Sequence, residues 1–121
     1  MKFYNYVYVD LLNEGKFIYK NIPFCFLYKP FYVGKGTGDR YKQHIKDCNK
    51  GLNHDKCKYI LRGNFDIIKF NYTDNENSAF MFERILIQNM WSDLTNKKDK
   101  GKRVKVSSRL SKRINKMNRK K

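Results

Sequence analysis

A single glutamate stands within the apolar stripe of a helix that the sequence predicts at about residues 76–92. The stripe consists of apolar residues at spacings of three and four: Ala79, Phe82, Leu86, Ile87 and Met90. Glu83 lies inside it, four residues after Ala79 and four before Ile87. Burial of a carboxylate costs free energy unless a cation, a metal or hydrogen bonds compensate its charge. Glu83 is therefore either a metal ligand or the partner of a Lys or Arg at the edge of the core.

A second group of residues has the chemistry to bind a phosphate. Arg40 and His44 are four residues apart in a predicted helix, so they share one of its faces. Lys35 and a glycine-rich turn come just before them. Arg offers a rigid fork of donors, and the free N–H groups at a helix N-terminus add to it. The alternative is a solvated basic helix face, because Lys42 and Lys46 are close in the sequence.

Three tyrosines are candidates for proton transfer. Tyr6, Tyr8 and Tyr32 lie on two predicted strands that can pair. A phenol close to cations loses or shares its proton more easily than its reference pKa near 10 suggests. The alternative is structural, since tyrosine is common as a half-buried strand residue.

Spacing argues against two other kinds of site. The segment GKGTGDR, residues 34–40, does not match the G-x-x-x-x-G-K-[ST] pattern of a nucleotide-binding phosphate loop. Cys48, His54 and Cys57 contain no CxxC pair and match no common zinc cage. We therefore expect neither site in this chain.

A few strands and helices have to position these residues. Alternating aromatic and β-branched residues predict three strands, at residues 3–9, 31–33 and 66–72. Helices are predicted from Thr37 or Asp39 to about Asn49, at about 54–62, and at about 76–92 with caps among Asp74 to Asn77. Residues 10–29 are predicted to form an irregular connection. The expected order is β-β-α-α-β-α.

Length and charge limit the classes of protein. The chain has 121 residues and a net charge of +16, which fits one small domain with an anionic partner, and nucleic acid is the default. Acidic and calcium-sensing classes are excluded. No apolar run approaches the roughly 18 residues of a membrane span, and the N-terminus lacks the features of a signal peptide. The three cysteines, an odd number, are expected to be reduced thiols in a cytoplasm.

The charge is concentrated at the C-terminus. Residues 1–95 carry 14 Lys or Arg and 10 Asp or Glu, whereas residues 96–121 carry 13 and only Asp99. We therefore predict a globular domain over 1–95 and a basic tail over 96–121. The tail has apolar residues at helical spacing: Val106, Leu110, Ile114 and Met117. It is either a basic amphipathic helix that contacts DNA or a disordered polycation that adds affinity through counterion release.

Together these segments resemble the GIY-YIG nuclease family. Tyr6-Val7-Tyr8 stands where the family has Gly-Ile-Tyr, with Tyr6 in place of the glycine, and Tyr32-Val33-Gly34 stands where it has Tyr-Ile-Gly. The run from Pro30 to Ile45, PFYVGKGTGDRYKQHI, is the most specific piece. It is similar to phage-encoded and homing-type members, with Arg40 and His44 at the expected offsets.

The resemblance continues to about residue 101. Residues 54–60 look like the family's basic helix, and residues 77–83 look like its acidic helix, with Glu83 at the metal-ligand position. Leu94-Thr95-Asn96, followed by Asp99 and Gly101, is similar to a closing Asn segment in degraded form. The implied fold is an α/β (α+β) sandwich, a small three-stranded antiparallel sheet flanked by about three helices. This agrees with the predicted elements.

The activity that the resemblance implies is Mg²⁺- or Mn²⁺-dependent hydrolysis of phosphodiester bonds by a DNA endonuclease of homing or phage type. The implied catalytic residues are Tyr8, Tyr32, Arg40, His44 and Glu83. Glu83 would hold the metal, Arg40 would neutralise the phosphorane, and Tyr8 would orient or deprotonate the water. The implied DNA-binding residues are Lys35, Lys56, Lys58 and Asn96.

The expected partner is double-stranded DNA, in the host cytoplasm if the protein is phage-encoded, with no membrane involved. One such site cuts one strand at a time, so a dimer would be needed to cut both strands together. Two other functions stay open: a catalytically inactive nucleic-acid-binding protein on the same fold, and a basic ribosome-associated or RNA-binding module. The ribosome-associated or RNA-binding function does not explain why Glu83 stands in an apolar stripe.

Overall fold

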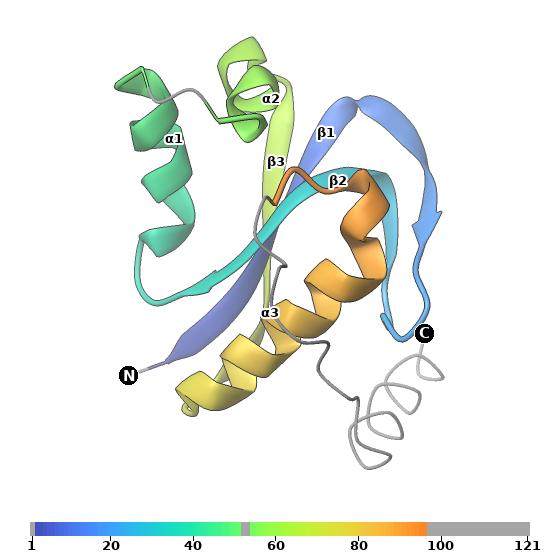
Figure 1. Cartoon of the computed structure of the whole chain (residues 1–121), viewed down its shortest axis with the longest axis vertical. Coiled ribbons are helices and arrows are strands. Elements are labelled where there is room, and N and C mark those ends of the chain that lie inside the picture. The colour runs from blue at the N-terminus through green and yellow to red at the C-terminus, as the bar shows by residue number, and fades with distance from the viewer. Residues whose placement is uncertain (1, 52–53, 97–121) are drawn as a thin grey trace.

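The computed structural model describes residues 2–51 and 54–96. Its helices and strands follow in the order β1 (Phe3–Ile18), β2 (Cys25–Gly36), α1 (Gln43–Asn49), α2 (Lys56–Arg62), β3 (Phe65–Thr73) and α3 (Glu76–Met90). Short 3-10 turns, η1 (Arg40–Lys42) and η2 (Trp91–Asp93), precede α1 and follow α3. The predicted tail lies outside the described residues, apart from Asn96. This is the α+β architecture expected from the sequence, with three strands and three α-helices (Figure 1).

The sheet is antiparallel and has the order β2-β1-β3, so β1 is the central strand. In the register of β1 with β2, Tyr8 is opposite Tyr32 and Tyr6 is opposite Gly34. Residues that face each other across an antiparallel pair point to the same side of the sheet. The register therefore places the GIY-like and YIG-like segments against each other.

Side chains alternate between the two faces of β1 and build two separate cores. The first packs α3 onto one face and is largely aliphatic: Val7, Val9, Ile22, Phe26, Val33, Phe82, Ile85, Leu86, Ile87 and Met90. The second packs α1 and α2 onto the other face and is largely aromatic: Tyr4, Tyr6, Tyr8, Phe31, Cys48, Cys57 and Ile60. We call these the aliphatic face and the tyrosine face of the sheet.

The prediction of an irregular connection over residues 10–29 is wrong. β1 continues to Ile18 and β2 begins at Cys25, so most of this segment is a long hairpin. The pairing shifts register at three places between Tyr8 and Phe17, and Leu11 and Leu12 are exposed. Register shifts and exposed apolar side chains remove the alternation by which a strand is recognised in a sequence.

The helix boundaries are close to the prediction, and one of the predicted N-caps is present. Asn75 caps α3, because its side chain accepts hydrogen bonds from the N–H groups of Asn77 and Ser78. The first predicted helix instead begins with η1, where Asp39 stands at the N-cap position without a side-chain cap hydrogen bond. α1 is therefore shorter than predicted.

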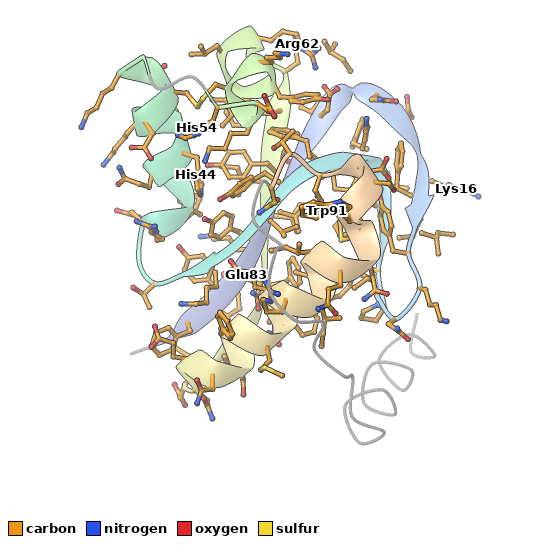
Figure 2. All side chains as sticks on the ribbon, in the orientation of Figure 1. Lys16, His44, His54, Arg62, Glu83 and Trp91 are labelled. Atoms are coloured by element: carbon orange, nitrogen blue, oxygen red, sulfur yellow. A yellow bond between two sulfur atoms is a disulfide. The ribbon has the colours of Figure 1, made fainter. Side chains whose placement is uncertain are left out.

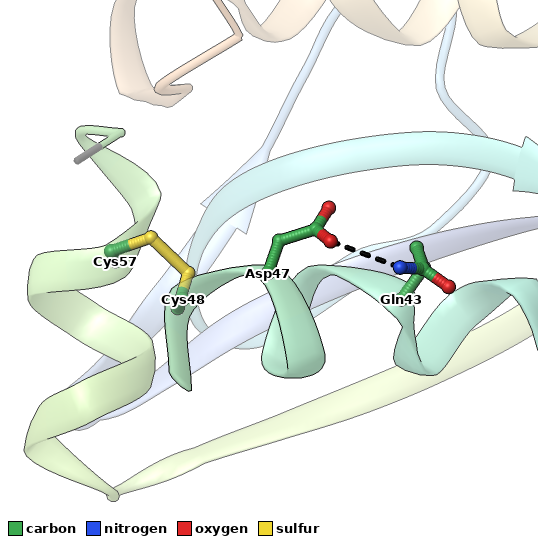
Figure 3. Close-up of a disulfide and its surroundings, with 4 residues drawn as sticks. All are labelled: Gln43, Asp47, Cys48 and Cys57. Carbon is green, nitrogen blue, oxygen red and sulfur yellow. Dashed lines mark hydrogen bonds between the residues drawn. A yellow bond between two sulfur atoms is a disulfide. The ribbon is translucent and has the colours of Figure 1, made fainter. Parts of the chain in front are cut away.

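The expectation of three reduced thiols is also wrong. Cys48 at the end of α1 and Cys57 in α2 form a disulfide, with 5.4 Å between their Cα atoms (Figure 3). Both cysteines are buried in the tyrosine face, whereas Cys25 is free and exposed. An odd number of cysteines left the pairing open, and only the packing of α1 beside α2 brings these two together. Within the described part of the chain, no helix is both long and apolar enough to cross a membrane.

Candidate active site

An open cleft of about 680 Å³ lies beside the outer edge of β2, between η1 and α1 on one side and α3 on the other. Because β2 is an edge strand, side chains from helices on both faces of the sheet can line the same cleft at this edge. In Figure 2 the labelled His44 and Glu83 come from these two helices. The cleft brings together six residues singled out from the sequence: Tyr6, Tyr32, Lys35, Arg40, His44 and Glu83.

Two glycines of the YVGKG segment allow close approach within this cleft. A Cβ atom on Gly34 would lie 2.4 Å from the phenol oxygen of Tyr6. A Cβ on Gly36 would lie 2.5 Å from the stem of Arg40. Neither position can carry a side chain without displacing a residue of the cleft, which explains why both are glycine.

The buried Tyr6 hydroxyl and Nε2 of His44 are 2.6 Å apart, which is hydrogen-bonding distance. Burial, with Lys56 and Arg40 nearby, lowers the pKa of His44 to about 4, so the imidazole is neutral at pH 7. Burial also raises the pKa of Tyr6 well above its ordinary value, so the phenol keeps its proton. Nδ1 of His44 is buried and has no hydrogen-bond partner among the described residues. The pair is a neutral phenol next to a neutral imidazole that can accept its proton.

Tyr8 has a different place from the one expected. Its side chain is fully buried, its hydroxyl donates to the backbone carbonyl of Tyr41, and its ring stacks on Phe65. It does not line the cleft, whereas Tyr6 does. Sequence reasoning named Tyr6 among the candidate tyrosines, but the family resemblance gave the catalytic role to Tyr8. The signal that identifies Tyr6 is its register opposite Gly34, which the sequence does not display.

The ring of Tyr32 lies close to the side chains of His44 and Lys56. Its ring centroid is 4.4 Å from that of His44 and 4.5 Å from Nζ of Lys56. Burial, together with the nearby Glu83, raises the pKa of Tyr32 to about 12. Tyr32 therefore enters any reaction at neutral pH as a phenol that can donate a hydrogen bond.

Glu83 is the half-buried carboxylate of the cleft. Burial raises the pKa of its carboxyl, while Lys35, Arg84 and a hydrogen bond from the Lys35 backbone act in the opposite direction. The Lys35 ammonium ion-pairs at 3.4 Å with Glu76. No cluster of three or more His, Cys, Asp or Glu that could hold a metal occurs in the described ranges. One half-buried carboxylate at an open cleft fits Mg²⁺, which binds through one or two carboxylates and keeps several waters or phosphate oxygens.

The remaining DNA-binding candidates are spread over the surface around the cleft. Lys58 is exposed and does not line the cleft. Asn96 is engaged in structure: it accepts from the N–H of Val33 at 3.0 Å and donates to the carbonyl of Val33 at 2.9 Å. Its amide thus extends the sheet at the edge of β2.

Comparison with known proteins gives one match. A family model described as the LEM-3-like GIY-YIG domain matches residues 3–119. No curated protein and no solved structure matches the chain.

Proposed function

Because the chain belongs to the GIY-YIG family, whose members are nucleases, we propose that it is a metal-dependent endonuclease that hydrolyses phosphodiester bonds in double-stranded DNA. The observation that carries the proposal is the content of one cleft. Arg40, Glu83 and the Tyr6–His44 pair, from four different elements, line the same hollow. These are the groups that hydrolysis of a phosphodiester requires: a cation for the phosphorane, a metal ligand and a route for the water's proton.

Glu83 is the residue proposed to hold Mg²⁺ or Mn²⁺. When bound there, the metal would polarise a phosphate oxygen and stabilise the departing 3′ oxygen. The half-buried carboxylate also attracts a cation for an electrostatic reason, since a positive charge beside it relieves the cost of burying the ionised form.

We assign the handling of the water's proton to Tyr6 rather than to Tyr8. The raised pKa of Tyr6 means that no phenolate waits in the resting site. Tyr6 can take a proton from water only as it passes its own proton to Nε2 of His44, 2.6 Å away. The low pKa of His44 means that the imidazole holds this proton briefly and returns it.

Arg40 is proposed to neutralise the equatorial phosphate oxygens, a contribution often worth about 3–4 kcal/mol. Tyr32 would donate a hydrogen bond in the same hollow. Lys35, Lys56 and Lys58 would bind the DNA backbone. Asn96 would contribute by fixing the edge of β2 that carries Val33.

The finer assignment follows the sequence resemblance. We propose an enzyme of homing or phage type that acts in the cytoplasm of its host, with the basic tail adding affinity for DNA. A dimer would cut both strands, and a monomer would nick one strand at a time. The competing function is a catalytically inactive protein that binds nucleic acid on the same fold.

The test is incubation of the full chain with supercoiled plasmid, with Mg²⁺ or with EDTA, beside Glu83→Gln. We expect Mg²⁺-dependent nicked or linear DNA with the natural protein and none with the variant, while both retain the plasmid in a gel-shift assay. Cleavage by Glu83→Gln at the natural rate would overturn the metal assignment. Salt-sensitive binding without cleavage by the natural protein, on plasmids that cover varied sequence, would support the inactive binding protein instead.

A further inference from the structure

A second hollow lies next to the proposed active site. Its volume is about 360 Å³, and its wall includes Tyr32 and Glu83, which also line the catalytic cleft. The rest of its wall consists of His54, Asp55, Lys56, Ile87, Thr95 and Asn96. Since the two hollows share two residues, a strand of DNA bound in the cleft can continue into this pocket without leaving the surface.

Lys56 is the lysine in the wall of the pocket, which also includes the carboxylates of Asp55 and Glu83. Its side chain is half-buried, and its ammonium lies 4.5 Å from the centroid of the Tyr32 ring. Burial lowers the pKa of Lys56. Among the described residues no carboxylate lies within ion-pair distance of its Nζ, unlike Lys35, which pairs with Glu76. A half-buried ammonium without an ion-pair partner at the wall of a hollow is suited to an anionic group.

Hydrogen bonds to β2 hold the wall of the pocket at residues 95 and 96. Thr95 donates its N–H and its hydroxyl to the carbonyl of Phe31, at 2.7 and 2.8 Å, and the Asn96 amide makes two hydrogen bonds to Val33. These bonds join residues 95 and 96 to the outer edge of β2 like a short additional strand. The pocket therefore lies between the edge of the sheet, the start of α2 and α3, which carries Glu83 and Ile87, and these hydrogen bonds hold its wall at residues 95 and 96.

The size of the pocket limits what it can hold. Its volume is at the lower end of the range of about 300–1,000 Å³ that is usual for ligand pockets. A hollow of this volume has room for one nucleotide. The Tyr32 ring and the side chain of Ile87 offer apolar surface in the same hollow.

We propose that this pocket is a nucleotide subsite, which holds the nucleotide next to the scissile phosphate with that nucleotide's own phosphate on Lys56. The subsite rests on the proposed function, because it assumes that the scissile phosphate lies in the neighbouring cleft. Lys56 is then a residue that positions the DNA strand, distinct from Arg40, which acts on the phosphate that reacts.

The test uses small probes with one or two phosphates and the full chain in Mg²⁺. Thymidine 3′,5′-bisphosphate, thymidine 5′-monophosphate and inorganic phosphate are titrated while backbone amide shifts are followed by NMR. We expect the bisphosphate to bind at least about tenfold more tightly than the monophosphate, because it engages one more charged partner. The amides of Lys56, Thr95 and Asn96 should shift with the bisphosphate.

Variants of Lys56 assign the second phosphate. Lys56→Gln should reduce the advantage of the bisphosphate to about twofold or less, and Lys56→Arg should retain it. Lys16→Gln is the control, since Lys16 is an exposed lysine of β1 that lines neither the pocket nor the cleft, and it should behave like the natural protein. Thermal unfolding of each variant checks that the fold is intact.

Three results would overturn the subsite: an undiminished bisphosphate advantage in Lys56→Gln, amide shifts confined to the cleft, or no binding of either nucleotide. Equal affinity for inorganic phosphate and the bisphosphate, with the same shifts at Lys56, would show an anion site without nucleotide recognition and would also overturn it. Plasmid cleavage is scored separately. If the natural protein cleaves the plasmid but replacing Lys56 does not change probe binding, the subsite is rejected and the nuclease function is kept. If replacing Lys56 weakens binding of the bisphosphate but the natural protein does not cleave, the nuclease function alone is rejected.

Discussion

The two faces of the central sheet are built from different chemistry. The aliphatic face carries α3, a helix of 15 residues, on a core of Val, Ile, Leu, Met and Phe side chains. The tyrosine face carries α1 and α2, each of seven residues, on three tyrosines from β1, one phenylalanine, one isoleucine and a disulfide. The same strand thus supplies apolar bulk to one side and hydroxyl groups to the other.

The difference shows how stability and chemistry are divided. On the tyrosine face each β1 phenol has a partner on the segment that follows β2: Tyr4 donates to the carbonyl of Gly38, Tyr6 pairs with His44, and Tyr8 donates to the carbonyl of Tyr41. These bonds fix residues 38–44, which carry Arg40 and His44. On the aliphatic face the buried Asn5 of β1 donates to the carbonyl of Ala79 in α3, and α3 contributes Glu76 and Glu83 to the cleft.

The largest effect is expected from removing one hydroxyl on the tyrosine face. Tyr6→Phe should lower the rate of plasmid cleavage about a hundredfold or more, because the water's proton then lacks its route to His44. Tyr8→Phe should change the rate less than about threefold while costing about 1–2 kcal/mol of unfolding free energy. Cleavage rates and urea unfolding of both variants check this. Similar rate losses in the two would contradict our assignment of Tyr6.

The next effect tests the aliphatic face. Leu86→Ala removes a fully buried side chain of α3. It should lower the free energy of unfolding by about 3 kcal/mol, because less apolar surface is buried and a cavity is left behind. Leu61→Ala, at an exposed position on α2, is the control and should change it by less than about 0.5 kcal/mol. Equal losses in urea unfolding would show that the aliphatic face does not dominate stability.

A somewhat smaller loss is expected when the disulfide is removed. Replacing Cys48 and Cys57 together by alanine should lower the free energy of unfolding by about 2–3 kcal/mol, because the bond no longer restricts the unfolded chain. Cys25→Ala, at the exposed free cysteine, should leave it unchanged. Amide hydrogen exchange should quicken in α1 and α2 and stay slow in α3. Uniform acceleration would mean that the two faces unfold as one unit.

The smallest effect is the pH dependence of His44. Its pKa is about 4 in the folded protein and near 6.5 in the unfolded chain, so the unfolded state binds more protons between these values. Stability should therefore fall as the pH drops from 6.5 to 4. His44→Gln, which cannot titrate, should lose about 1–2 kcal/mol less over this range in urea unfolding. Parallel curves would show that His44 is not buried as a neutral group.

The parts of the fold that follow local periodicity were predictable from the sequence. The stripe on α3, the cap at Asn75 and the strand beginning at residue 3 all express repeating patterns or short-range hydrogen bonds. The hairpin beyond residue 10 was missed because its register shifts hide the alternation.

The candidate site was predictable only as a set of residue types. Arg40, His44 and Glu83 line one cleft, yet the choice between Tyr6 and Tyr8 depends on the partner of each hydroxyl, which is set by packing against η1 and α1. The disulfide likewise depends on how α1 and α2 pack. Contacts between segments far apart in sequence leave no local pattern.

The hydrogen bonds of Thr95 and Asn96 also affect how the sheet meets other molecules. An uncovered edge strand presents free N–H and C=O groups, which invite pairing with another chain. Residues 95 and 96 occupy such groups on Phe31 and Val33, so a second copy cannot extend the sheet along this stretch of β2. Sheet-to-sheet self-association along this stretch of the strand that carries Tyr32 is thereby blocked, beside the cleft proposed to bind DNA.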